Sequence, residues 1–453
     1  MSVCQSWSVL VCPGLSCTAS LLPLYLSSRG DPVRPEGFPA LRAHSSVWGK
    51  PESVGVPEQR GETWRSSSSL GHTGQQSYCR HGKTWCNLSL GSGICHRITE
   101  AADCVIKKIL SSQPGKILDI KDVFNCYTGD VISRYVFGQS MGFIDQEGWT
   151  PNFATWVKSF LQSAYMMRHN VVARKLAQYI PLMADYMGED IATVMKQMNV
   201  VIPGYIQAAL DDPDNGRVFA EVLQNKSLPD QYKDMFHLSG EGFNFLLAGT
   251  ETTAAILTVI THHLLAQPAI YKRLMQTLGD TSSSTPEWSH LENNPYFWAI
   301  VQESLRIMPG VSHRSARIAR DEDLHYKNAA GDIVHIIPRG TPIGMSSVIN
   351  HMDPSLFHDP EAFKPERWLL EDGSPNHKLK NYLLAFGRGS RACISEKLAN
   401  CEIYTLAVRM ASRVIPRATL HEPGNPAEHF KYDHDMIVLQ TKNGPISCKI
   451  SIC

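Results

Sequence analysis

The 453-residue sequence has no excess charge of either sign, because 43 Lys and Arg residues balance 43 Asp and Glu residues. A chain without net charge produces no field that would attract a polyanion, so nucleic acid is not the expected partner. Charged residues make up 19% of the chain and hydrophobic residues 43%, as in ordinary globular proteins. The length allows roughly three domains or one large helical domain.

Cysteine is missing from residues 127–392, and the twelve cysteines of the chain follow no regular spacing. A chain of this length does not need disulfides to hold its fold, so a secreted disulfide framework is not expected. Cys79, Cys86, Cys95 and His96 lack the paired spacing of a closed zinc site, which favours scattered thiols. The sequence also lacks a glycine-rich dinucleotide fingerprint, so no flavin or NAD(P) domain is predicted.

The first 28 residues carry no charged side chain, and they also lack the leading Lys or Arg of a signal peptide. Pro13, Gly14 and Pro23 interrupt the apolar run, so a membrane anchor is disfavoured. Residues 30–93 are rich in Gly, Pro, Ser and Arg and have little periodic hydrophobicity. This composition predicts loop or disorder.

Apolar residues recur at helical spacing from about Ile98 onward. Gly138 predicts the end of one helix and Pro268 the end of another. The predicted helices cover residues 123–135, 153–161, 230–266, 295–307 and 394–414.

A short β region is predicted between the last two helices. Leu324 and Tyr326 are expected to face Val334 and Ile336 across a turn at residues 328–331. A Pro-rich irregular segment, 338–384, follows, and the chain ends in a strand-like tail. The predicted fold class is therefore mainly α with a small β region.

The middle of the long helix, residues 243–266, is apolar enough to resemble a membrane span. Glu251, His262 and His263 argue against a span, because an acid near its centre costs about 2.5–3.5 kcal/mol. The polar run Thr250-Glu251-Thr252-Thr253 follows Gly249, and such residues can open the hydrogen-bond ladder of a helix and leave room for a ligand or water. The alternative is a helix that passes a polar neighbour.

The strongest chemical signal is Cys393, which follows a glycine-punctuated loop with two arginines, Arg388 and Arg391, and precedes a predicted helix. A helix N-terminus and nearby guanidinium groups both favour a thiolate. From these features alone, Cys393 could be a nucleophile, a redox thiol, a metal ligand or a buried structural cysteine.

The spacing of Phe386, Gly389, Arg391 and Cys393 resembles the haem-binding loop of the cytochrome P-450 family. The resemblance implies that Cys393 is the axial ligand of haem iron and that these residues bind haem, the expected cofactor. The family usually has Gly where this chain has Ser395.

Further motifs occur in the order of the family. Glu303 and Arg306 lie three residues apart on one helix face, and with Arg367 they resemble the family's buried charge network, which supports the fold and the haem pocket. An exposed pair of these charges would contribute little.

Two other assignments follow from the same resemblance. Thr252 is expected to hold bound dioxygen and its water, while Glu251 relays protons. Arg317 aligns with an arginine that binds a haem propionate, with Arg314 as an alternative in the same stretch, and Arg391 would serve the other side.

The resemblance covers residues 98–453 and leaves residues 1–97 atypical and partly disordered. The family's Trp-x-x-x-Arg helix is not found, because Trp85 is followed by Ser89 where Arg is expected. We therefore expect residues 98–453 to form a haem-thiolate catalytic domain that is incomplete at its N-terminal side. Residues 1–97 are either a divergent replacement or the product of a truncated or misjoined gene model.

The resemblance implies a haem-dependent monooxygenase that inserts one oxygen atom from O2 into an apolar small molecule, as in filamentous-fungal secondary metabolism. An NADPH-dependent reductase would donate electrons. The expected location is the cytosolic face of the endoplasmic reticulum membrane, or a soluble form because the anchor signal is weak. Two alternatives stay open: a haem-thiolate isomerase or dehydratase, and a non-catalytic, haem-deficient family member.

Overall fold

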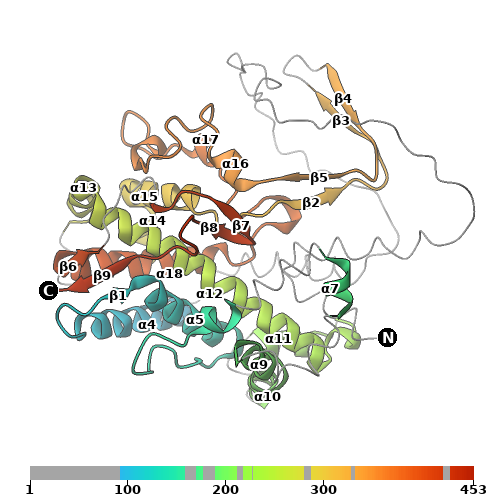
Figure 1. Cartoon of the computed structure of the whole chain (residues 1–453), viewed down its shortest axis with the longest axis horizontal. Helices are drawn as coiled ribbons and strands as arrows, with labels where there is room; N and C mark the ends of the chain where they lie inside the picture. The colour runs from blue at the N-terminus through green and yellow to red at the C-terminus, as the bar shows by residue number, and fades with distance from the viewer. Residues whose placement is uncertain are drawn as a thin grey trace, which may run out of the picture. The chain divides into compact units, whose positions relative to one another are not determined.

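The computed structural model describes residues 92–158, 170–176, 189–211, 218–226, 228–279, 287–327, 332–421 and 429–453 (Figure 1). The chain divides into two compact units, and the described residues of the smaller one lie within Ala316–Gly344. The predicted anchor region, Cys79, Cys86, Phe160, Leu161 and the 328–331 turn lie outside the described residues.

Helices dominate the larger unit, as the sequence predicts. They are α4 (Ser92–Leu110), α5 (Ile120–Phe137), α7 (Val171–Leu176), α9 (Glu189–Lys196), α10 (Ile202–Asp211), α11 (Val218–Gln224), α12 (Met235–Ala266), α13 (Pro268–Leu278), α14 (Trp288–Glu292), α15 (Pro295–Ile307), α16 (Ser347–His351), α17 (His377–Lys380) and α18 (Glu396–Arg409).

The strands are short and form small sheets. Strand β9 (Lys449–Ile452) pairs antiparallel with both β1 (Leu118–Asp119) and β6 (Ala418–Leu420), and β7 (His434–Met436) pairs with β8 (Val438–Gln440). In the smaller unit, β2 (Ser315–Ile318) pairs with β5 (Pro342–Met345), and β3 (Leu324–Lys327) pairs with β4 (Ile333–Ile337). The predicted class, mainly α with a small β region, is confirmed.

The predicted hairpin forms, but its register differs from the prediction. Leu324 pairs with Ile337 and Tyr326 with His335, and the register shifts between Tyr326 and Lys327. Alternation of apolar residues shows which residues share a face of a strand, but it does not show where the pairing with the other strand shifts by one residue.

Several predicted boundaries also move. The long helix begins at Met235, after a separate 3-10 turn at Asp230–Tyr232, because Asp234 caps its first turn by accepting a hydrogen bond from the His237 N–H. The last helix begins at Glu396 and continues into a π-helical turn, Met410–Val414. The segment predicted to be irregular, 338–384, contains β5, α16, α17 and a 3-10 turn.

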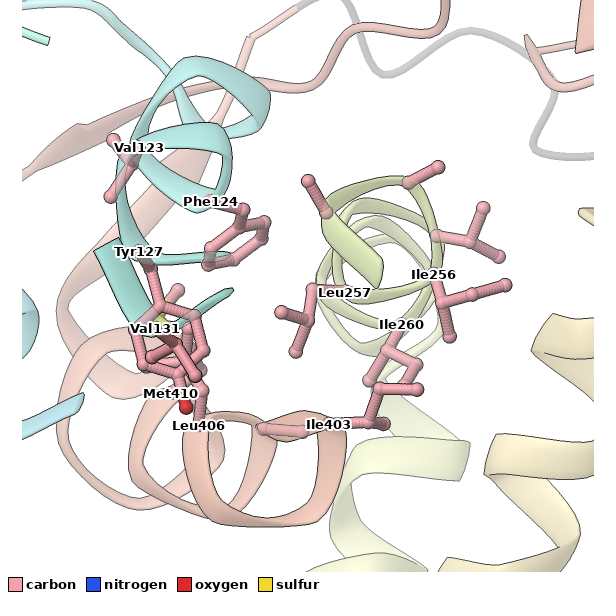
Figure 2. Packing of buried hydrophobic residues seen from close by; sticks show 14 of the residues in the cluster. Val123, Phe124, Tyr127, Val131, Ile256, Leu257, Ile260, Ile403, Leu406 and Met410 are labelled. Atoms are coloured by element: carbon pink, nitrogen blue, oxygen red, sulfur yellow. The ribbon is translucent and has the colours of Figure 1, made fainter. Parts of the chain in front are cut away.

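The core lies where α5, α12 and α18 meet. Figure 2 shows Phe124 and Tyr127 of α5 near Leu257 of α12, with Leu406 of α18 below them. All four side chains are buried. Helix α12 is the one helix in the described part of the chain that is long and apolar enough to cross a membrane, and 67% of its most apolar window is buried inside the protein. Packing inside the protein over most of its surface explains its apolar length.

Gly249 allows α12 to approach α5 closely. A Cβ atom at this position would lie 2.6 Å from Cγ1 of Ile132 on α5. The helix runs from Met235 to Ala266 without a change of helix type, and an opening of its hydrogen-bond ladder near Gly249 stays a prediction. The missing side chain serves helix packing, which leaves the threonine hydroxyls to bond within α12.

Replacing Gly249 with Ala should therefore destabilise the protein. The added methyl group forces α5 and α12 apart, and overpacking of this kind costs about 1–3 kcal/mol. Gly240→Ala is the matched control on the same helix, because a Cβ there meets no atom within 4 Å. It should be neutral or stabilise by up to about 1 kcal/mol. Equal denaturation midpoints for the two variants would contradict this account.

Candidate functional site

The loop that carries Cys393 is held by its own backbone. The Cys393 N–H donates to the Phe386 carbonyl at 2.7 Å, and the Gly387 N–H donates to the Leu384 carbonyl at 2.9 Å. Gly387 and Gly389 have φ angles of 66° and 73°, which residues with a side chain rarely adopt. The glycines therefore bend the loop so that Cys393 is presented just before α18.

The Cys393 sulfur lies beside the start of α18. Its Sγ is 3.5 Å from Oγ of Ser395, and Ser395 is the N-cap residue of that helix. The Ser395 side chain makes no capping hydrogen bond, so its hydroxyl is directed to the sulfur instead. A hydroxyl in this position can donate to a thiolate, which is a contact that Gly at the same position could not make.

The donor set of this loop fits a haem group. Cys393 supplies a half-buried sulfur, and the exposed Arg391 guanidinium, two residues earlier, makes no hydrogen bond to another residue of the described chain. Phe386 packs against the hydrophobic core and leaves an apolar side to the loop. A soft sulfur ligand, a cation for a carboxylate and an apolar wall are what an iron porphyrin requires.

Glu303 lies at the centre of a charge network in which Glu303 and Arg306 are fully buried and Arg367 is 10% exposed. Its carboxylate accepts hydrogen bonds from Arg306 Nη2 at 2.8 Å and Nε at 2.9 Å, and from Arg367 Nε at 3.1 Å. The Trp368 indole N–H and the Lys364 backbone N–H donate to the same carboxylate at 2.8 and 2.9 Å. Burial alone would raise the pKa of Glu303, but these bonds and the two guanidinium charges outweigh it and lower the pKa.

Arg306 and Arg367 extend the network to backbone carbonyls. Arg306 donates to the carbonyls of His351 and Ala362, and Arg367 donates to those of His358, Asp359 and Ala362. The network thereby ties α15 to residues 351–368, a segment with little regular structure. The side chains that the sequence analysis grouped do lie together.

Glu251 is held by a lysine that the sequence analysis did not identify. The Nζ of Lys121, near the start of α5, forms an ion pair with Glu251 Oε1 on α12, and the side chains are only 10% and 15% exposed. A single lysine on a largely buried helix was the signal that could have identified it. The pair connects the two helices that cross at Gly249.

Thr252 bonds within its own helix. Its hydroxyl donates to the Ala248 carbonyl at 2.9 Å, and a Cβ at Gly310 would lie 3.5 Å from its methyl group. Helix α12, which carries Thr252, packs on α18, the helix that begins three residues after Cys393. Arg317 belongs to the smaller unit, where its exposed side chain donates to the Ala316 carbonyl. Arg314 is also exposed.

Cys95 and His96, near the start of α4, have partners other than a metal in the described part of the chain. His96 pairs with Glu100 at 3.3 Å, and Cys95 Sγ lies 4.0 Å from Cys401 Sγ. Within the described ranges, no group of three His, Cys, Asp or Glu side chains could hold a metal ion. A cavity of about 660 Å³ is lined by residues of α4 and α5 together with Ser140, Ile144 and Asp145, and Cys393 is not among its lining residues.

Two buried histidines of α12 pack beside the charge network. The His263 ring stacks on Phe363 at 3.9 Å, and the His262 ring stacks on His429 at 4.2 Å. His262 is fully buried with both ring nitrogens unpartnered. Burial and the neighbouring His429 lower the pKa of His262 to about 3.

Stability should therefore fall as the pH is lowered from about 6.5 towards 4. The unfolded chain binds a proton at His262 below pH 6.5 whereas the native protein does not, which costs about 1.4 kcal/mol per pH unit. Urea unfolding at several pH values tests this expectation. His262→Phe keeps a flat ring but cannot titrate. In this variant the slope of unfolding free energy against pH should be smaller by about 1.4 kcal/mol per pH unit, which corresponds to one proton. An unchanged slope would contradict the assignment.

Breaking the Lys121–Glu251 pair should cost about 3 kcal/mol, because one charge then stays nearly buried without its partner. Urea unfolding of Lys121→Met, Glu251→Gln and the double variant measures this cost. The double variant should lose much less than the two single losses added together. Additive losses would show that the two charges do not interact.

Comparison with known proteins agrees with the loop geometry. A family model described as Cytochrome P450 matches residues 83–427. Cytochrome P450 monooxygenase ucsK of Acremonium sp is 32% identical over 359 residues, which are 74% of this chain and 68% of that protein. Cytochrome P450 monooxygenase ppzE of Metarhizium majus is 32% identical over 339 residues, 70% of this chain and 71% of that protein.

A third relative, cytochrome P450 monooxygenase claJ of Penicillium crustosum, is 31% identical over 302 residues, 64% of this chain and 67% of that protein. The match of the family model and the extent of these similarities establish the family and its haem cofactor. The protein is accordingly an oxidoreductase that uses a redox partner and incorporates oxygen from O2 into a small molecule. The chain belongs to the cytochrome P450 family.

Proposed function

We propose that Cys393 is the axial ligand of haem iron and that Phe386, Gly389 and Arg391 complete the haem-binding loop. The observation that carries this assignment is the bond from the Cys393 N–H to the Phe386 carbonyl, in a loop bent by two glycines with positive φ. This bond fixes the backbone from which the sulfur projects. The exposed Arg391 supports a role in binding a haem carboxylate.

Haem, when bound, supplies the activation of dioxygen and the oxidation itself. The residues of α12 then manage protons: Thr252 offers a hydroxyl, and Glu251 offers a carboxylate held in place by Lys121. Glu303, Arg306 and Arg367 act in the stability of the fold and of the Cys393 loop. Arg317 stays a prediction as a second carboxylate ligand.

The substrate class and partners belong to the same proposal. An apolar small molecule, such as a secondary metabolite, is the substrate, and an NADPH-dependent reductase supplies electrons. Residues 98–453 form the catalytic domain, located at the cytosolic face of the endoplasmic reticulum membrane. The similarity to fungal monooxygenases supports a small-molecule substrate, because it gives the chemistry of the reaction.

Cys393→Ser should abolish the red-shifted thiolate band in the reduced carbon monoxide difference spectrum of the full chain supplied with haem. Serine cannot provide the sulfur donor that produces this band. Cys401→Ala is the matched control, because Cys401 is a buried thiol on α18 outside the loop. It should keep the band. Loss of the band in both variants, or in neither, would overturn the assignment of the ligand.

The two alternative functions give different results. A haem-thiolate isomerase or dehydratase would show the thiolate band but form product without reductase and O2. A non-catalytic member would show no thiolate band even in the wild-type chain with haem supplied. Product that contains one oxygen atom from labelled O2, and that requires the reductase, supports the monooxygenase.

A further inference from the structure

His351 is a buried histidine that none of the assigned motifs includes. It is the last residue of the short helix α16 and is 0% exposed. Its ring packs edge-on against Phe357, with ring centroids 6.2 Å apart. A fully buried imidazole must pair its polar atoms, so the partners of its two ring nitrogens define what it does.

Both ring nitrogens of His351 have backbone partners. Nδ1 lies 3.0 Å from the Arg306 carbonyl oxygen, and Nε2 lies 2.8 Å from the Leu384 backbone nitrogen. A carbonyl can only accept and an N–H can only donate, so Nδ1 carries the ring proton and Nε2 accepts. One neutral tautomer satisfies both bonds.

The first bond joins His351 to the buried charge network. Arg306 accepts from the ring through its carbonyl, and its Nη1 donates to the His351 carbonyl at 2.9 Å. Arg306 is in turn fixed by two hydrogen bonds to Glu303. His351 is therefore held at both its ring and its backbone by a residue that cannot move without breaking a buried ion pair.

The second bond joins His351 to the Cys393 loop. Leu384 donates to the ring, and its carbonyl accepts from the Gly387 N–H at 2.9 Å. Between them lies Phe386, whose carbonyl accepts from the Cys393 N–H. A continuous path of hydrogen bonds and short backbone segments thus runs from the Glu303 carboxylate through the His351 ring to Cys393.

Burial is the main factor that keeps the His351 ring neutral. Arg306 and Glu303 of α15 both act on it, and burial lowers the pKa of His351 to about 4. The ring is consequently neutral at ordinary pH, with Nε2 able to accept from Leu384.

We propose that His351 is a positioning residue for the haem-thiolate ligand: it transmits the fixed position of the Glu303–Arg306 pair to the loop that holds Cys393. The proposal rests on the assignment of Cys393 as the ligand. Without the bond to Leu384, the loop loses its one described link to the imidazole, and the sulfur is placed less accurately for iron. Groups hydrogen-bonded directly to a metal ligand contribute about 10–100-fold to affinity or activity, and because His351 acts through Leu384 we expect an effect of about 10-fold.

Three variants of His351 separate its two bonds. His351→Gln reaches as far as Nε2 and offers an oxygen to the Leu384 N–H, whereas His351→Asn reaches only as far as Nδ1 and keeps a donor for Arg306. His351→Leu removes both bonds. The readouts are haem affinity by titration and the share of bound haem that shows the thiolate band in the reduced carbon monoxide spectrum, all measured on the full chain.

We expect haem affinity and the share of haem with the thiolate band to be higher in wild type and His351→Gln than in His351→Asn and His351→Leu. The Asn variant should bind haem about 10-fold more weakly and show a band that is partly shifted to the position of a neutral ligand. If the Leu variant binds no haem, recovery by Gln supports the proposal and failure of Gln contradicts it. His262→Phe, a change at an equally buried histidine with no link to the loop, should leave the band unchanged.

An Asn variant equal to wild type would overturn the role of the Leu384 bond, and so would loss of the band in His262→Phe to the same extent. Failure of the proposed function itself gives a different result, because the wild-type chain would then show no thiolate band.

Discussion

The rest of the site depends on the hydrogen bonds and ion pairs made by the buried carboxylate of Glu303. It is 0% exposed and accepts bonds from two guanidinium groups, an indole N–H and a backbone N–H. A carboxylate in such a place is stable only while every partner stays in position, because an unpaired buried charge is very costly. The network therefore fixes α15 against residues 351–368, where regular structure is scarce and local propensity specifies little.

A short series of hydrogen bonds links the Glu303 network to the Cys393 loop. Arg306 holds His351, His351 holds Leu384, and the turn that follows holds Cys393. On the other side, Gly249 lets α12 lie close to α5, and the Lys121–Glu251 pair connects these two helices beside Thr252. The core in Figure 2 supports both arrangements, since α5, α12 and α18 share it.

Much of the fold was predictable because the helices carry strong periodic patterns and clear end signals. Pro295–Ile307 was located to the residue, since an N-terminal proline marks its start. The register of the β3–β4 hairpin was not, because an irregularity between Tyr326 and Lys327 leaves no mark in the alternation of apolar residues. The motif residues of the proposed site were grouped from their spacing and their resemblance to the family, and their roles in haem binding stay predictions. Lys121 and His351 were not identified, because their roles depend on partners far away in the sequence: Lys121 pairs with Glu251, and His351 bonds Leu384.

The central claim is that the sulfur of Cys393 binds haem iron in a loop whose position is set by the Glu303 network. X-ray absorption at the iron edge of the full chain reconstituted with haem tests it most directly. The account predicts one sulfur neighbour in the first coordination shell of the iron. A shell that contains only nitrogen and oxygen would contradict it.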